Sequence, residues 1–252
     1  AFNQRVYLLE RHIRRLRDSA AALGIAFPAY LDSADELVAQ LCRANGLSAA
    51  RIRITLTRGA FDGHLEHGRK SQSTCLVGAT QLDKKFSDLD RRNTLSWTAR
   101  LTLRHTTGQA AHKTLSYLPN VLAHSEAIEA GDDVALLRDG RGRPVEAATA
   151  NLFAIRRGQI ITPSIRQHCL PGIIRGRVIE LARAAGLALR IAPLSTHELK
   201  AADEAFVTNA VVYVMPLRAV DGRALGEKIP GALTARLQRM MLDEVAAATA
   251  AR

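Results

Sequence analysis

The sequence lacks the features of membrane proteins, disulfide-rich secreted proteins and disordered chains. No apolar run approaches the roughly 18 to 20 residues of a transmembrane helix, and no apolar signal core lies near the N-terminus. The three cysteines, Cys42, Cys75 and Cys169, are odd in number and far apart, so they predict neither a disulfide framework nor a metal site. Hydrophobic residues make up 47% of the chain, enough to bury a core. We therefore expect a cytoplasmic globular protein with no membrane contact and no bound metal.

Aromatic residues and lysines are scarce, whereas arginines are abundant. Aromatic residues account for 4% of the chain, and only six of its 35 basic residues are lysines, which leaves 29 arginines and a net charge of +11. These arginines are spread along the chain and form no basic tail or stripe. A nucleic-acid partner would favour clustered basic residues with aromatic residues among them. We therefore expect no nucleic-acid partner and interpret the arginine excess as compositional bias, with an anionic small-molecule ligand left open.

The spacing of apolar residues predicts helices and strands in a mixed order. The helices are expected at residues 7–23, 32–45, 116–130, 173–185 and 233–248. The strands are expected at residues 51–57, 95–105, 134–137, 151–155, 159–162 and 205–208. This order is typical of an α/β or α+β protein. A strongly polar segment predicts a linker at residues 84–93, between a small domain at 1–83 and a larger one at 94–252.

Three features could carry chemistry. Lys113 lies between a strand-like segment and the apolar start of a helix, and apolar surroundings would make its amine a better nucleophile; the alternative is a lysine that reaches solvent. Glu146 lies in a run of small and apolar residues, where it is either paired or solvated. Residues 170–175 enter a helix through Pro-Gly, and a helix start of this kind can bind an anion.

In this order, these features resemble the fold-type IV pyridoxal-phosphate enzymes. That family includes branched-chain aminotransferases, D-amino-acid aminotransferases and aminodeoxychorismate lyases. The resemblance is carried by residues 113–123, 145–153, 162–173, 202–210 and 215–216, with further matches at 7–16 and 52–59. It therefore covers nearly the whole chain, and several motifs in one order are more specific than any one of them.

The resemblance implies a role for each matching residue. Lys113 would hold the cofactor as a Schiff base and move protons at the substrate α-carbon. Glu146 would face the pyridine nitrogen and keep it protonated. The cofactor phosphate would be bound by Arg15 and by the backbone amides of Ile173 and Ile174. Asn209, Ala210 and Val211 would also bind the cofactor.

The sequence also departs from the family pattern. Many members have hydroxyl residues in place of Ile174 and Val211, so here only backbone amides are expected to contact the phosphate. D-amino-acid aminotransferases carry an Arg and a His in place of Gly63 and Leu65, which argues against that activity. The expected substrate contacts are His64, Ala148, Thr149 and Asn209.

The fold implied by the resemblance has a small N-terminal α/β domain and a larger, mixed β-barrel-like C-terminal domain with helices. The family's first strand would precede residue 1, so we expect the small domain to lack it. The expected protein is a homodimeric pyridoxal-phosphate aminotransferase that acts on amino acids, branched-chain ones favoured, and on 2-oxo acids. The alternatives are an aminodeoxychorismate lyase, which eliminates pyruvate to give 4-aminobenzoate, and a non-catalytic homologue.

Overall fold

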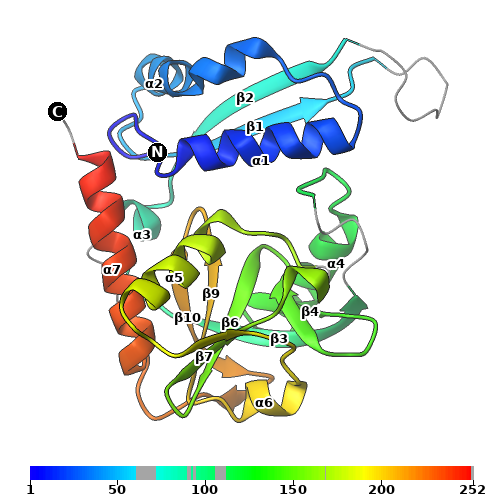
Figure 1. The fold of residues 1–252 in the computed structure, drawn as a ribbon, viewed down its shortest axis with the longest axis vertical. Coiled ribbons are helices and arrows are strands. Elements are labelled where there is room, and N and C mark those ends of the chain that lie inside the picture. The colour runs from blue at the N-terminus through cyan, green and yellow to red at the C-terminus, as the bar shows by residue number, and fades with distance from the viewer. Residues whose placement is uncertain (61–71, 90–91, 93–94, 106–111, 168, 251–252) are drawn as a thin grey trace. The chain divides into compact units, whose positions relative to one another are not determined.

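The computed structural model describes residues 1–60, 72–89, 92, 95–105, 112–167 and 169–250 (Figure 1). The chain forms two compact units, one of Ala1–Asp88 with Glu244–Arg252 and one of Leu89–Asp243. The segment expected as a linker begins with a short helix, α3 (Lys84–Ser87), in which the Asp83 carboxylate accepts a hydrogen bond from the Lys85 amide. The domain boundaries given above stay a prediction.

The first unit combines helices with a two-stranded hairpin. Its main elements are α1 (Leu9–Ala22), α2 (Ala34–Ala44), β1 (Ala50–Thr57), β2 (Thr74–Gln81) and the short 3-10 helix Ala29–Ser33. The strands are antiparallel, with Ala50 opposite Gln81. Val38 and Cys42 of α2 pack with Ala50 in a small buried cluster. This unit has the α/β character expected of it.

The second unit contains a nine-stranded sheet. Its strands are β3 (Trp97–His105), β4 (Val134–Arg138), β5 (Pro144–Ala147), β6 (Ala150–Arg156), β7 (Gln159–Thr162), β8 (Leu189–Ile191), β9 (Glu204–Asn209), β10 (Tyr213–Val220) and β11 (Arg223–Ala224). Four of these strands, β5, β8, β10 and β11, were not expected from the sequence.

Six of these strands close into a barrel. β9 pairs with both β6 and β10, and this completes the ring β10-β3-β4-β5-β6-β9. The pairs β10–β3 and β3–β4 are parallel, and the other four pairs are antiparallel. The rings of Phe153 and Phe206, on paired strands, stack with their centroids 4.7 Å apart. The mixed, barrel-like fold expected from the sequence is confirmed.

Four helices complete the second unit: α4 (Leu118–Glu129), α5 (Ile173–Ala184), α6 (Thr196–Lys200) and most of α7 (Ala232–Thr249). The expected helices at 116–130, 173–185 and 233–248 correspond to α4, α5 and α7, whereas α6 was not expected. Ala123 and Ala127 of α4 are buried against Ala135 and Leu137 of β4. This packing fixes the segment that follows Lys113 on the barrel wall.

The described residues also show three absences. Their three cysteines are free thiols, and they hold no group of three or more His, Cys, Asp or Glu side chains that could ligate a metal. No helix in the described ranges is both long and apolar enough to span a bilayer. The cytoplasmic location stays a prediction.

Candidate active site

Glu146 is a buried carboxylate that accepts two hydrogen bonds within the second unit. It lies on β5 opposite Asn151 of β6, and only 8% of the residue is exposed. Its Oε2 accepts hydrogen bonds from the Leu170 amide at 2.9 Å and from Asn151 Nδ2 at 3.4 Å. Of the two alternatives that the sequence left open, the structure shows the paired one. A buried carboxylate at neutral pH needs such partners.

The environment of Glu146 brings the pKa of its carboxyl group close to neutral pH. Burial raises the pKa of Glu146 to about 7, although the Leu170 hydrogen bond and the charges of Lys113 and Arg175 act in the opposite direction. Both hydrogen bonds fall on Oε2, so Oε1 accepts none from the residues that the structure describes. One carboxylate oxygen therefore stays available to a donor that the chain does not supply.

Asn151 connects Glu146 to the start of α5, a connection that sequence reasoning missed. Its Nδ2 also donates to the Leu170 carbonyl at 2.8 Å. A methyl group added at Gly172 would lie 1.9 Å from Asn151 Oδ1, so the backbone at Gly172 approaches the amide more closely than any residue with a side chain allows. The only sequence signal was the place of Asn151 inside the 145–153 motif.

The start of α5 presents the backbone amides that the sequence assigned to phosphate. Gly172 is the N-cap in an extended conformation and provides no side-chain cap, and Ile173 and Ile174 are the first two helical residues. The first amides of a helix have no acceptor within the helix, and the helix dipole makes this end positive. The amides of Ile173 and Ile174 therefore suit an anion, although the residues' side chains are apolar.

The β9–β10 turn is organised by Asn209. Asn209 Oδ1 accepts hydrogen bonds from the Val211 amide at 2.8 Å and the Val212 amide at 2.9 Å, and Nδ2 donates to the Thr149 carbonyl at 3.2 Å. The Val211 amide, expected to contact the phosphate, thus has an acceptor inside the protein. Exposed Ala210 lies between Asn209 and Val211. These contacts place the turn beside the β5–β6 connection.

Arg92 also holds the β9–β10 turn through a hydrogen bond. The sequence did not predict this residue. Its side chain is buried, Nη1 donates to the Val211 carbonyl at 2.6 Å, and the guanidinium lies 5.0 Å from the centroid of the Tyr213 ring. Burial lowers the pKa of Arg92 to about 10, so the group stays charged at neutral pH. Because its partners lie more than a hundred residues away in sequence, no local pattern could reveal this contact.

Ala148 and Thr149 contribute backbone carbonyls, not side chains, to these contacts. The Ala148 carbonyl accepts hydrogen bonds from Tyr117 Oη at 2.7 Å and Asn120 Nδ2 at 2.8 Å. Together with the Asn209–Thr149 bond, these contacts join the segment after Lys113 to the β5–β6 and β9–β10 turns. The structure therefore brings four of the sequence motifs to one end of the barrel.

Of the two alternatives that the sequence left open for Lys113, the structure shows the lysine that reaches solvent. The residue is exposed, and its Nζ lies 5.7 Å from the centroid of the Tyr117 ring. Leu115 and Leu118, two of the apolar residues that follow Lys113, are themselves 56% and 66% exposed. The sequence pattern showed that apolar residues follow Lys113 but not which way they face. The charge of Lys113 also lowers the pKa of Glu146.

For two expected site residues, the structure gives no place relative to this cluster. Arg15 lies on α1 in the first unit, so its role as a phosphate ligand stays a prediction. His64 lies outside the described residues. Arg175 was not expected: it is buried, donates to Thr162 Oγ1 at 3.2 Å and to the Pro163 carbonyl at 2.8 Å, and lowers the pKa of Glu146 by its charge.

Comparison with known proteins decides the family. The model of the family described as "Amino-transferase class IV" matches residues 1–220. The chain belongs to the class IV aminotransferases. It is 33% identical over 243 residues to a Methanocaldococcus jannaschii protein provisionally named a branched-chain-amino-acid aminotransferase, with 96% of this chain and 84% of that one covered. It is 30% identical over 253 residues to the branched-chain-amino-acid aminotransferase of Pseudomonas aeruginosa, with 98% and 80% covered.

Solved structures with a similar fold include a branched-chain aminotransferase. The T.th. branched-chain amino acid aminotransferase, complexed with N-(5'-phosphopyridoxyl)-L-glutamate, matches with a TM-score of 0.83 and 25% identity over 97% of this chain and 79% of that one. A Legionella pneumophila protein provisionally named a 4-amino-4-deoxychorismate lyase matches with a TM-score of 0.84 and 23% identity over 97% and 88%. At that identity, the second likeness shows a shared fold alone.

Class IV aminotransferases are pyridoxal-phosphate enzymes, either transaminases or lyases, and the residues of this chain fit that cofactor in two respects. Oε1 of Glu146 is available to a ring nitrogen that carries a proton. The start of α5 offers backbone amides to a phosphate without a competing acidic residue in its first turn. The donor set thus matches the two ends of the cofactor.

Proposed function

We propose that this class IV aminotransferase is a transaminase that moves an amino group between an amino acid and a 2-oxo acid with pyridoxal phosphate bound at Glu146, Lys113 and the start of α5. The observation that carries the proposal is the Glu146 carboxylate, which is buried, held on one oxygen by two donors and open on the other. Such a group suits a protonated ring nitrogen. When bound, pyridoxal phosphate supplies an electron-accepting ring.

Each residue has a stated part in this proposal. Lys113 would hold the cofactor covalently and would take and return the proton at the substrate α-carbon. Glu146 holds the proton on the ring nitrogen, and Asn151 keeps Glu146 in place. The amides of Ile173 and Ile174 bind the phosphate. Asn209 orders the turn and the Thr149 carbonyl beside it.

Branched-chain amino acids are the favoured substrates. The support comes from the Methanocaldococcus and Pseudomonas relatives, which are both named as branched-chain-amino-acid aminotransferases. The glutamate conjugate bound to the T.th. enzyme suggests glutamate and 2-oxoglutarate as the second pair. Ala148 and Thr149 would contact the substrate through their backbone.

Direct assay separates this function from the alternatives. Purified protein with added pyridoxal phosphate is incubated with 2-oxoglutarate and leucine, isoleucine, valine or D-alanine, and glutamate is measured. We expect glutamate from the three branched-chain donors. Pyruvate release from aminodeoxychorismate, without glutamate formation, would make the protein a lyase. Activity in neither assay, with cofactor bound, would contradict both.

We also propose that the protein is a homodimer. The outer face of α4 and the residues before it carry large exposed side chains, namely Leu115, Leu118, Val121, Leu122 and Ile128. Exposed apolar groups concentrated on one helix are typical of interaction surfaces. A second copy of the chain would remove them from water.

A further inference from the structure

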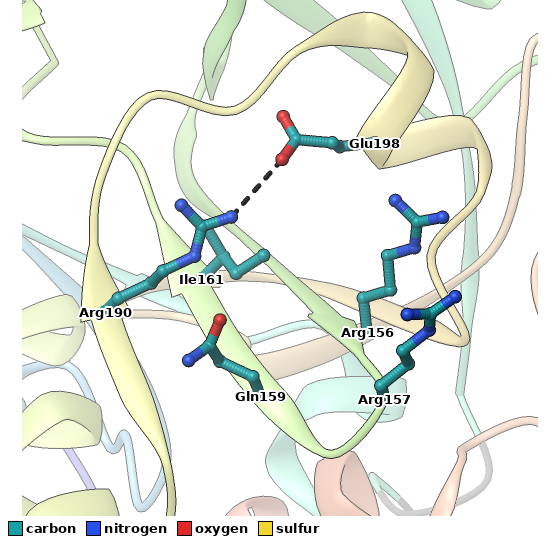
Figure 2. A pocket seen from close by; sticks show the side chains of 6 residues that line it. All are labelled: Arg156, Arg157, Gln159, Ile161, Arg190 and Glu198. Carbon is teal, nitrogen blue, oxygen red and sulfur yellow. Dashed lines mark hydrogen bonds and ion pairs between the residues drawn. The ribbon is translucent and has the colours of Figure 1, made fainter.

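A polar hollow lies at the Arg156 end of strand β6, whereas Asn151 of the candidate active site lies near the other end. Figure 2 shows the side chains that line the hollow. Its volume is about 400 Å³, within the range of small-molecule sites. It is lined by Arg156, Arg157, Gln159, Ile161, Arg190 and Glu198. None of these residues belongs to the candidate active site. Five residues of extended strand put Arg156 about 17 Å from Asn151, so the two sites are separate.

The backbone of the β6–β7 turn brings two consecutive arginines to this hollow. Neighbouring residues of a strand normally point to opposite faces. Arg157, however, has a φ of 49° and Gly158 a φ of 76°, the left-handed geometry of a two-residue hairpin turn. The Arg157 amide donates to Asp203 Oδ2 at 2.5 Å, which stabilises that turn. Figure 2 shows Arg156 and Arg157 on one side of the hollow and Arg190 on the other.

The positive charge of the hollow exceeds its negative charge. The guanidiniums of Arg156 and Arg157 form no hydrogen bond or ion pair with any residue that the structure describes. Glu198 is already engaged on both oxygens: Oε1 accepts from Arg190 at 3.3 Å, and Oε2 accepts from the Ser195 amide and hydroxyl, each at 2.8 Å. The Ser195 hydrogen bonds, with a smaller effect of Arg190, lower the pKa of Glu198, so it is ionised at neutral pH. Three guanidiniums and one carboxylate leave a charge of plus two.

We propose that this hollow binds the phosphate dianion of a phosphorylated small molecule. Planar guanidinium groups match phosphate oxygens in paired hydrogen bonds, and a dianion balances the net charge. The volume exceeds that of a bare phosphate, so an organic group has room beside it. The Gln159 amide and the Ile161 side chain provide a polar and an apolar contact for that group.

Calorimetric titration with glycerol 3-phosphate tests the site. The protein is first loaded with pyridoxal phosphate, so that the cofactor's own phosphate position is filled, and free cofactor, which could itself enter the hollow, is removed by gel filtration. Ionic strength is held constant. The site variant is R156Q/R157N, because asparagine tolerates the left-handed backbone at position 157. The control, R183Q/R223Q, removes the same charge from two exposed positions outside the hollow. We expect one probe per chain, with affinity at least about tenfold weaker in the site variant and unchanged in the control.

Three results would overturn the proposal. One is the absence of saturable binding by the parent protein, and another is equal loss of affinity in both double variants, which would indicate a diffuse charge effect. The third is equal affinity for succinate, which would show that the hollow does not select phosphate. Inorganic phosphate forms a further arm, and weaker binding of it than of glycerol 3-phosphate supports a contact to the organic group. Circular dichroism confirms that each variant is folded.

Discussion

Glu146 is the residue at which burial, hydrogen bonding and chemistry meet. A carboxylate that is 8% exposed and open on one oxygen is unfavourable in the empty protein, because burial disfavours its charge. A bound ring nitrogen that carries a proton would offset this cost. The site thus gives up stability in the free protein in order to hold the cofactor in one protonation state.

The pH dependence of stability should reveal this cost. The pKa of Glu146 is raised from 4.5 to about 7, so the folded chain binds the proton more tightly than the unfolded chain does. Stability therefore falls as pH rises through this window. Compared with E146Q, the cofactor-free parent should lose about 3 kcal/mol of unfolding free energy between about pH 4 and about pH 8. Urea unfolding of both proteins across this pH range measures the difference in unfolding free energy. If the free energies of the two proteins change in parallel with pH, the prediction is wrong.

Gly172 should tolerate no side chain. A methyl group there would lie 1.9 Å from Asn151 Oδ1, so G172A displaces Asn151 from Glu146 and from the Leu170 carbonyl. We expect a loss of about 1–3 kcal/mol in stability and weaker cofactor binding. The matched control is G176A, because an added Cβ at Gly176 meets no atom within 4 Å and alanine favours a helix. Equal unfolding free energies for G172A and G176A would show that the close contact between Gly172 and Asn151 does not contribute to stability.

At the scale of elements, the candidate site depends on turns that distant residues hold. Periodicity predicted α1, α2, α4, α5 and α7 because each has a continuous apolar stripe. It missed β5, in which Glu146 interrupts a run of small and apolar residues, and β10, in which Pro216 interrupts the run. β9 was predicted, but its ring-closing pairs with β6 and β10 are long-range and leave no local pattern.

Sequence reasoning had the same limit at the site. Lys113, Glu146 and the α5 start were found because each is a chemical group in an unusual local context. Asn151, Arg92 and Arg175 were missed because their importance lies in partners that only the folded chain brings near. The sequence left the exposure of Lys113 open for the same reason, because it does not show that Leu115 and Leu118 are exposed.

Removal of Arg92 should loosen the β9–β10 turn. R92M keeps the buried volume but removes the hydrogen bond to the Val211 carbonyl and the charge over the Tyr213 ring. We expect a loss of about 2–4 kcal/mol in unfolding free energy, because a buried acceptor is left without its donor. Arg218 is the control: its Nη1 donates to the Ser96 carbonyl at the same 2.6 Å, but its side chain is 46% exposed. R218M should cost less than about 1 kcal/mol, and equal losses would contradict this account.

At the scale of the whole molecule, the net charge of +11 has a more specific meaning than composition suggested. Arg92 and Arg175 are buried structural groups, and Arg156, Arg157 and Arg190 gather at one hollow. The lysines are few, and two others have partners: Lys200 pairs with Asp221 at 2.7 Å and Lys85 with Asp83 at 3.7 Å. The charge of Lys113 acts on Glu146, whose pKa it lowers.

The proposed dimer can be tested on α4. L118D places a charge on the exposed apolar face, where the monomer tolerates it because Leu118 is 66% exposed. Light scattering coupled to size exclusion should show a dimer for the parent and a monomer for L118D. I165D, which changes an exposed aliphatic residue outside α4, should remain a dimer. A monomeric parent at micromolar concentration would contradict the proposal.

The most direct test of the central claim is to identify the lysine that carries the cofactor. The protein is incubated with pyridoxal phosphate, reduced with borohydride, digested and analysed by mass spectrometry. The account predicts a phosphopyridoxyl group on the peptide that contains Lys113 and its loss in K113A. A stable modification at Lys70, Lys84, Lys85, Lys200 or Lys228 instead, or none at saturating cofactor, would contradict it.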